Sequence, residues 1–242
     1  MSESMKKTFN IVGLFLIPGG IIAIAYYLLI PTVVNIGYPN MIALVVTCIL
    51  VLVPLMLGIM YFYSKREYGV FSLDKIITYK KPIAIKHYLW LVPSLLVWAA
   101  GIFTFLKPLD ELIKTTFFGW IPERLILSGD FSTLAKPQLL ISFVLVFLIV
   151  GILAPIVEEI YFRGFLYPKM EWMGRAAPFV HALLFSVYHF WSPWQMITRF
   201  IAIFPFCYVA YRTKNIKIAI IVHCLLNIFG DSIVILFLYL QA

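Results

Sequence analysis

The chain has 242 residues, of which 63% are hydrophobic and only 12% are charged. Its mean hydropathy of +0.98 excludes a soluble domain with a polar surface and indicates an all-α, polytopic integral membrane protein. The net charge of +8 does not indicate a nucleic-acid partner, because the basic residues lie in separate short loops between apolar segments, as positive-inside topology requires.

Apolar length predicts seven membrane-spanning helices, the fifth of them short, near residues 9–34, 41–63, 88–106, 138–166, 177–192, 195–211 and 216–240. The basic residues of the loops place the N-terminus in the cytoplasm and the C-terminus outside. Lys6 and Lys7 before the first segment resemble the start of a signal peptide. Because that segment is long enough to span, we expect it to stay uncleaved.

The two long connections, residues 67–87 and 108–135, mix apolar and charged side chains. This mixture predicts helices that lie flat on the membrane surface. Residues 1–137 provide the N-terminal spans and these loops, and residues 138–242 form the core that carries the polar motifs described next. Both parts belong to one membrane domain.

Three ionisable residues follow the most apolar segment of the chain, namely Glu158, Glu159 and Arg163. Charged side chains at bilayer depth are costly, so we expect these to be functional. Glu159 and Arg163 are spaced i,i+4 and can pair on one helix face, whereas Glu158 lies about 100° around the helix with no local cation. An unpaired buried carboxylate can exchange a proton near neutrality, as a general base must. The alternative is a helix end at which the charges have reached the lipid headgroups.

Three uncharged polar residues lie in later apolar segments. His223 and Asn227 are spaced i,i+4, so they point the same way and form a donor patch of the kind that stabilises an oxyanion. His189 stands four residues after Phe185 and shares its helix face. Hydrogen bonding between helices is the alternative for all three. Counting ~1.5 Å per residue puts Glu158 and His223 roughly two to three turns from the inner face, but His189 nearer the outer end of its span.

Arg199 and Asp231 are the remaining charged residues of the apolar segments, and we expect them to form a structural ion pair between adjacent helices. His181 and His87 have no assigned role.

The motifs of other intramembrane proteases are missing from the sequence, including His-Glu-x-x-His of zinc enzymes. Cys48, Cys207 and Cys224 lie in apolar segments without CxxC spacing, so we expect free, buried thiols with no disulfide framework and no zinc knuckle. Cys224 follows His223 directly and therefore points about 100° away from it, which makes it a poor nucleophile partner for that histidine.

The combined pattern resembles a known family. Glu158-Glu159-x-x-x-Arg163, Phe185-x-x-x-His189 and His223-x-x-x-Asn227, in this order, are similar to the signature of the CAAX protease and bacteriocin-processing family. That family includes type II CAAX prenyl endopeptidases and bacterial members tied to peptide processing or self-immunity. The resemblance covers roughly the last third of the chain.

The resemblance implies roles for the motif residues. Glu158 with His189 would activate a water molecule, and His223 with Asn227 would hold the oxyanion, while the Glu159 and Arg163 pair would support the site. No cofactor is required on this interpretation. Glu158, His189 and His223 could instead bind Zn²⁺ with a fourth position open.

We therefore expect an intramembrane endopeptidase that hydrolyses a peptide bond in a membrane-associated or prenylated, CAAX-type protein or peptide with an activated water. The alternative is a proteolytically inactive membrane scaffold or bacteriocin self-immunity protein of the same fold. A transporter is a third hypothesis, but the chain shows no paired discontinuous helices in two matching halves. The expected partners are the substrate and the lipid bilayer, with no nucleic acid, and the resemblance implies a multi-pass protein of a prokaryotic plasma membrane.

Overall fold

A computed structural model describes residues 3–127 and 130–242, which form helices joined by short connections and contain no β-strand. One isolated antiparallel bridge joins Lys80 to Asn215. The predicted all-α fold class is confirmed.

The helical segments follow one another along the chain, and several long helices are continuous through α-helical and π-helical segments. In order they are α1 (Glu3–Asn35), α2 (Asn40–Thr47), η1 (Cys48–Leu52), α3 (Val53–Tyr68), α4 (Leu73–Ile76), α5 (Ile85–Phe105), α6 (Lys107–Phe117), η2 (Glu123–Leu125), α7 (Lys136–Leu145), η3 (Val146–Leu153), α8 (Ala154–Glu159), η4 (Ile160–Leu166), η5 (Pro168–Ala176), α9 (Ala177–Tyr188), η6 (Pro193–Gln195), α10 (Met196–Thr213), α11 (Lys217–Asn227), η7 (Ile228–Ser232) and α12 (Ile233–Gln241).

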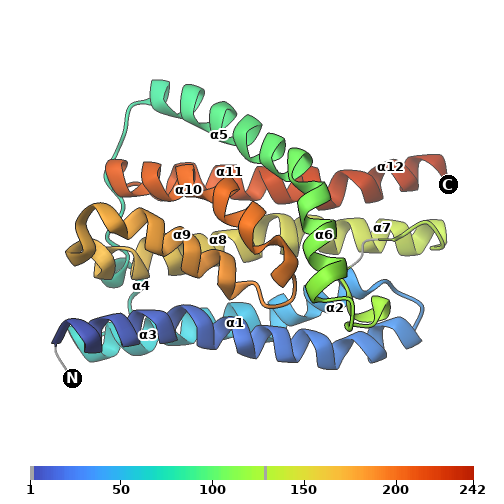
Figure 1. The fold of residues 1–242 in the computed structure, drawn as a ribbon, viewed down its shortest axis with the longest axis horizontal. Coiled ribbons are helices and arrows are strands. Elements are labelled where there is room, and N and C mark those ends of the chain that lie inside the picture. The colour runs from blue at the N-terminus through green and yellow to red at the C-terminus, as the bar shows by residue number, and fades with distance from the viewer. Residues whose placement is uncertain (1–2, 128–129) are drawn as a thin grey trace.

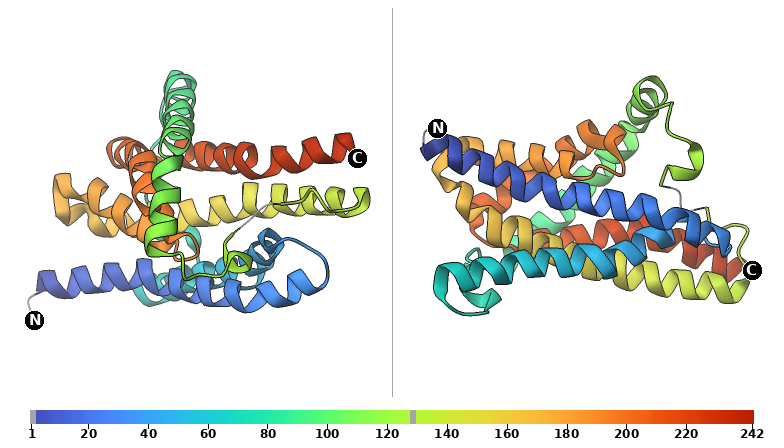
Figure 2. Two further views of the ribbon diagram at one scale, coloured as in Figure 1. Left: turned by 45° about the vertical axis from the view of Figure 1, so that its right-hand side comes forward. Right: turned by 90° about the horizontal axis from the view of Figure 1, so that it is seen from below.

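Five helices are long and apolar enough to cross a membrane, and they cover Met5–Asn35, Asn40–Tyr68, Ile85–Phe105, Lys136–Leu166 and Lys217–Gln241. They form an elongated bundle with the two termini at opposite ends (Figures 1 and 2). Large apolar side chains cover its outside, such as Phe9, Val97 and Phe105, which are 78%, 73% and 80% exposed. An exterior of this kind suits lipid rather than water, as expected for an integral membrane protein.

The π-helical segments η1 and η3 each end just before a proline, Pro54 or Pro155. Proline has no backbone N–H, so a carbonyl one turn earlier loses its usual donor. The wider i→i+5 bonding of a π turn offers that carbonyl another donor. The long helices therefore stay continuous through both prolines, which keeps the residues beyond them at a defined depth.

The expected fifth span, residues 177–192, is shorter in the structure. α9 has 12 residues, which is about 18 Å and well short of the ~30 Å hydrocarbon core. After it the chain turns at Ser192, whose φ of −144° and ψ of 60° are non-helical, as expected before Pro193. α10 then packs back along α9, and the turn of this hairpin lies part-way along the bundle (Figure 1).

The two long connections differ from each other. Between the end of α3 and the start of α5, the connection 67–87 contains only the single turn α4, so the helix predicted there is limited to one turn. Residues 108–135 include most of α6, which lies across the long helices beside the α9–α10 turn (Figure 1). α6 is joined to α10 by a hydrogen bond of 2.5 Å from the Thr198 hydroxyl to the carboxylate of Asp110.

α1 approaches the end of α9 closely at Gly19. A Cβ atom at this position would overlap the backbone carbonyl oxygen of Tyr188. Glycine therefore permits the two helices to touch here, directly behind the residues that form the candidate site.

Candidate active site

The two adjacent glutamates and the arginine are all buried in the middle of the bundle. Glu158 and Glu159 lie at the end of α8, and Arg163 lies one turn later in η4. Their exposed fractions are 5%, 1% and 1%. The long helix continues beyond them through η4 and their side chains are enclosed by protein, so they do not form an exposed helix end.

Glu159 holds two donors with one oxygen atom. Arg163 Nη1 donates to Glu159 Oε1 at 2.9 Å, which confirms the predicted i,i+4 pair. His223 Nδ1 also donates to Glu159 Oε1, at 2.8 Å. The Arg163 guanidinium lies 4.1 Å from the centre of the Phe185 ring, and its Nη2 is 3.7 Å from Cys207 Sγ. Glu159 thus fixes the orientation of His223 as well as neutralising Arg163.

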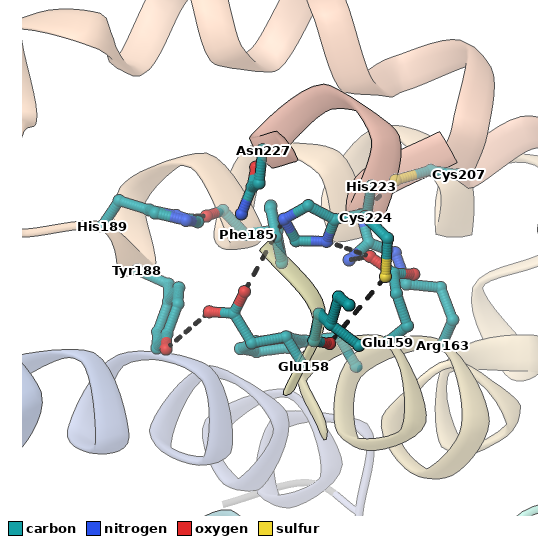
Figure 3. Close-up of polar contacts among 12 residues, drawn as sticks. Glu158, Glu159, Arg163, Phe185, Tyr188, His189, Cys207, His223, Cys224 and Asn227 are labelled. Atoms are coloured by element: carbon teal, nitrogen blue, oxygen red, sulfur yellow. Dashed lines mark hydrogen bonds and ion pairs between the residues drawn. The ribbon is translucent and has the colours of Figure 1, made fainter. Parts of the chain in front are cut away.

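Glu158 points about 100° around the helix from Glu159 and has no direct cation partner on its own helix, as predicted. Its Oε1 accepts a hydrogen bond from the Tyr188 hydroxyl at 3.0 Å, and its Oε2 lies 3.8 Å from His223 Nε2 (Figure 3). The second separation is too long for a direct hydrogen bond. Tyr188 was missed from the sequence, although a buried tyrosine hydroxyl needs a polar partner and this one directly precedes the motif histidine.

His189 follows the last residue of α9 and has left the helical conformation, with φ −81° and ψ 60°. Its Nδ1 donates to the carbonyl oxygen of Phe185 at 2.8 Å. In a neutral ring this leaves Nε2 unprotonated and able to accept a proton. His189 thus lies at the end of its helix, as expected, and because α9 is short this end reaches Glu158, so His189 and Glu158 line the same cavity.

Asn227 and His223 lie on α11, one turn apart. The Asn227 side-chain amide donates to the carbonyl oxygen of Val150 at 2.9 Å, and its second N–H remains available. η3 and η7 approach closely beside this bond, since a Cβ on Gly151 would lie only 2.9 Å from Ile228. Cys224 points elsewhere, 3.8 Å from the carbonyl oxygen of Ile152, as its spacing predicted.

The residues of the three motifs line one cavity of about 580 Å³ between the helices. We call this the site cavity, and Figure 3 shows how its polar side chains converge from the segments around α8, α9 and α11. Its polar lining includes Glu158, Glu159, Arg163, His189, Arg199, His223, Asn227 and Asp231. The sequence motifs, separated by up to about 70 residues, are therefore brought together.

The expected ion pair between Arg199 and Asp231 is wrong. Arg199 Nη2 donates to Ser192 Oγ at 2.7 Å and to Gln195 Oε1 at 3.1 Å, so its partners come from the α9–α10 turn. No ion pair joins it to Asp231 among residues 3–127 and 130–242.

The unassigned histidines have structural roles in the described part of the chain. His181 is fully buried, donates from Nε2 to the carbonyl oxygen of Phe162 at 3.0 Å, and stacks on Tyr167 at 4.2 Å between ring centroids. His87 is exposed and contacts the carbonyl oxygen of Ala84 at the start of α5. The three cysteines are free thiols, as predicted, although Cys224 is only half-buried.

The side chains that could hold a metal are Glu158, His189 and His223. Among the described residues, no three His, Cys, Asp or Glu side chains are grouped closely enough to bind a metal ion. His223 Nδ1 is occupied by Glu159, and its Nε2 is 3.8 Å from Glu158. This donor arrangement does not fit a zinc site as it stands.

Comparison with known proteins gives two matches. Residues 140–229 match a family model described as "Type II CAAX prenyl endopeptidase Rce1-like". The UPF0177 protein YxdF of Lactococcus lactis subsp. lactis (strain IL1403) is 29% identical over 84 residues, which cover 35% of this chain and 47% of that protein. The matched part thus spans about half the length of this curated relative. No solved structure matches the chain.

Proposed function

We propose, from the match of residues 140–229 to the Rce1-like model of type II CAAX prenyl endopeptidases, that the protein is an intramembrane endopeptidase. Its substrate would be a membrane-associated or prenylated protein or peptide. One observation carries the proposal: a base, two histidines and an amide from separate segments line one cavity inside an apolar bundle. Peptide hydrolysis by water needs a base, an oxyanion site and room for the substrate, and these residues can supply each.

Glu158 is proposed as the general base. The Tyr188 hydroxyl fixes one carboxylate oxygen, which leaves Oε2 facing the site cavity. A water between this oxygen and the bond to be cleaved would give its proton to Glu158 as it attacks. His189 Nε2, which has no hydrogen-bond partner among the described residues, can accept the water's second hydrogen and orient it.

His223 and Asn227 are proposed to hold the oxyanion. With Nδ1–H directed at Glu159, a doubly protonated His223 presents Nε2–H to the cavity. The free N–H of Asn227 lies one turn further along the same helix face. Two fixed donors stabilise negative charge that develops on the carbonyl oxygen. Glu158 can then pass its proton to the leaving amine, which completes hydrolysis without an acyl-enzyme.

We propose that the reaction needs no metal, because Glu158, His189 and His223 are not grouped closely enough to hold a metal ion and His223 Nδ1 is bonded to Glu159. Purified protein treated with a chelator should keep most of its activity. Loss of activity on chelation, with full recovery on addition of Zn²⁺, would overturn this part of the proposal.

The proposal is tested by comparing the peptide termini of cells that carry the wild-type protein, Glu158→Gln or the control Glu123→Gln, which alters an exposed loop glutamate. Termini that depend on the protein should be present with the wild type and the control, and absent with Glu158→Gln at equal protein abundance. Identical termini in all three strains would favour the inactive scaffold and contradict the protease.

A further inference from the structure

One carboxylate of the site cavity has no part in the proposed reaction. Asp231 lies in η7 and is half-buried, and its carboxylate has no hydrogen-bond or ion-pair partner within the described ranges 3–127 and 130–242. A carboxylate without a partner inside an apolar bundle is costly. Its presence in a cavity wall therefore points to a ligand that meets it there.

Asp231 stands where two cavities meet. It lines the site cavity and also a second cavity of about 320 Å³, whose other lining residues include Phe131, Trp194 and Val234. Met41, at the start of α2, lines both as well. The second cavity thus adjoins the first beside α2 and α12, the elements that carry Met41 and Val234.

The π-helical turn aligns Asp231 with the oxyanion residues. His223, Asn227 and Asp231 follow one another at intervals of four residues, which in an uninterrupted α-helix would leave the last about 80° out of line with the first. The wider turn of η7 reduces this rotation, and all three side chains line the site cavity. Asp231 lies about 6 Å along the helix from Asn227, a distance that two residues of extended peptide cover.

The other charge in this part of the cavity cannot neutralise Asp231. Arg199 is held by Ser192 and Gln195, as described above, and its Nη1 donates to the carbonyl oxygen of Ser186 at 3.4 Å. Its hydrogen bonds hold the guanidinium on the α9–α10 turn, without an ion pair to Asp231. A carboxylate left without a partner in the cavity wall is complementary to a positively charged group on the ligand.

We propose that Asp231 is a specificity-determining residue that binds a basic side chain of the substrate, Lys or Arg, about two residues from the bond that is cleaved. The inference rests on the proposed function, because it assumes that the peptide lies along α11 and η7 with its reacting carbonyl at His223 and Asn227. Binding of the basic side chain itself requires only the cavity and Asp231.

Binding is tested with the inactive variant Glu158→Gln in lipid nanodiscs. The probes are palmitoylated, fluorescent nonapeptides of otherwise uncharged sequence, in which one Lys is moved through every position, each paired with a norleucine peptide. At one or two positions, the Lys peptide should bind at least about tenfold more tightly than its norleucine partner. Adding Asp231→Asn should abolish the difference, and adding Asp231→Glu should keep it.

Asp110→Asn in the same background is the matched control, because Asp110 is a buried aspartate that does not line the site cavity. It should leave the preference for Lys unchanged. Asp231→Asn breaks no ion pair within the described residues, so its melting temperature should match that of the parent. Equal binding of Lys and norleucine peptides at every position, or a preference that survives Asp231→Asn, would overturn the inference.

Cleavage of the same peptides by protein with intact Glu158 separates this inference from the proposed function. Cleavage that shows no preference for Lys would overturn the role of Asp231 and leave the protease. A preference for Lys in binding, with no cleavage of any peptide, would overturn the protease and support Asp231 as a cation-binding residue.

Discussion

Glu159 is the residue on which most of the site's geometry depends, since one of its oxygen atoms accepts from both Arg163 and His223. The two donors belong to different helices, so this carboxylate also joins η4 to α11. Glu158, its neighbour, meets only a hydroxyl at hydrogen-bond distance. The two adjacent carboxylates thus bind different partners, because they point in different directions from the helix: Glu159 binds Arg163 and His223, and Glu158 binds Tyr188.

Replacing Glu159 with glutamine should damage both stability and activity. Arg163 would be left as a buried cation without its counter-ion, a loss of ~3–5 kcal/mol for a buried pair, and the melting temperature should fall. The remaining folded protein should also cleave more slowly, because His223 loses the charge that orients it.

Glu67→Gln is the matched control for Glu159→Gln. It removes the ion pair of 2.6 Å between Glu67 and Lys169, which is partly exposed near the end of α3. An exposed pair contributes ~0–1 kcal/mol, so the melting temperature should hardly change. Equal melting temperatures for Glu159→Gln and Glu67→Gln would contradict the role of the buried pair.

Sequence spacing predicted the Glu159–Arg163 pair because an i,i+4 contact depends on one helix alone. The contacts between different helices were harder to predict from the sequence. The partner of Arg199 is Ser192, in a turn whose position depends on where α9 ends, so the pairing with Asp231 was a wrong choice among distant candidates. The bond from Tyr188 to Glu158 depends on the same helix end.

At the scale of elements, the α9–α10 hairpin decides which residues meet. Apolar length predicted the long helices well, because span length follows from the thickness of the bilayer. The same rule overestimated the length of the helix in segment 177–192. A local signal decided its end, because Ser192 precedes Pro193 and turns the chain. The early turn is what brings His189 to the level of Glu158.

The contact between α1 and α9 offers a test of this arrangement. Gly19→Ala would push a methyl group into the backbone of Tyr188, and overpacking of this kind costs ~1–3 kcal/mol. We expect a lower melting temperature and slower cleavage, because the Tyr188 hydroxyl positions Glu158.

Gly20→Ala is the control, since a Cβ at Gly20 meets nothing within 4 Å. It should be neutral or stabilise the helix by up to ~1 kcal/mol. The packing account fails if both alanine variants melt and cleave like the wild type.

A polar cluster joins η5, the end of α10 and the connection before α5. Lys214 donates to Glu171 at 2.6 Å, and the Tyr79 hydroxyl donates to the same oxygen at 2.8 Å. The hydrogen bond from Lys214 holds the pKa of Glu171 below its ordinary value of 4.5. This bond therefore stabilises the fold above about pH 4.5 and is lost as the pH falls through the lowered pKa.

The melting temperature of the wild type should accordingly fall on acidification below about pH 5, and part of this fall should be missing in Glu171→Gln. Thermal unfolding of both proteins across this range, in the same detergent, measures the difference. Parallel curves for the two proteins would show that the cluster contributes nothing to acid stability.

At the scale of the whole molecule, the topology follows from the termini at opposite ends of the bundle (Figure 2). Five helices can each cross the membrane, and the α9–α10 hairpin adds two crossings or none. The number of crossings is odd in either case, so the predicted topology does not depend on how deeply the hairpin enters.

Reporter fusions should therefore place residues 64–87, 167–176 and 212–217 in the cytoplasm and the C-terminus outside. The loop charges and the positive-inside rule give the direction. A cytoplasmic C-terminus alongside a cytoplasmic N-terminus would contradict the odd number of crossings.

The bundle as a whole supplies what its single helices lack, a cavity between apolar helices in which polar groups from separate segments converge. The most direct test is the rate at which purified protein, alone in lipid vesicles, cleaves a peptide identified from the terminus comparison. Glu158→Gln should cleave it ~10²–10⁴-fold more slowly than the wild type, with an unchanged melting temperature. Cleavage by Glu158→Gln at the wild-type rate would contradict the assignment of Glu158 as the base.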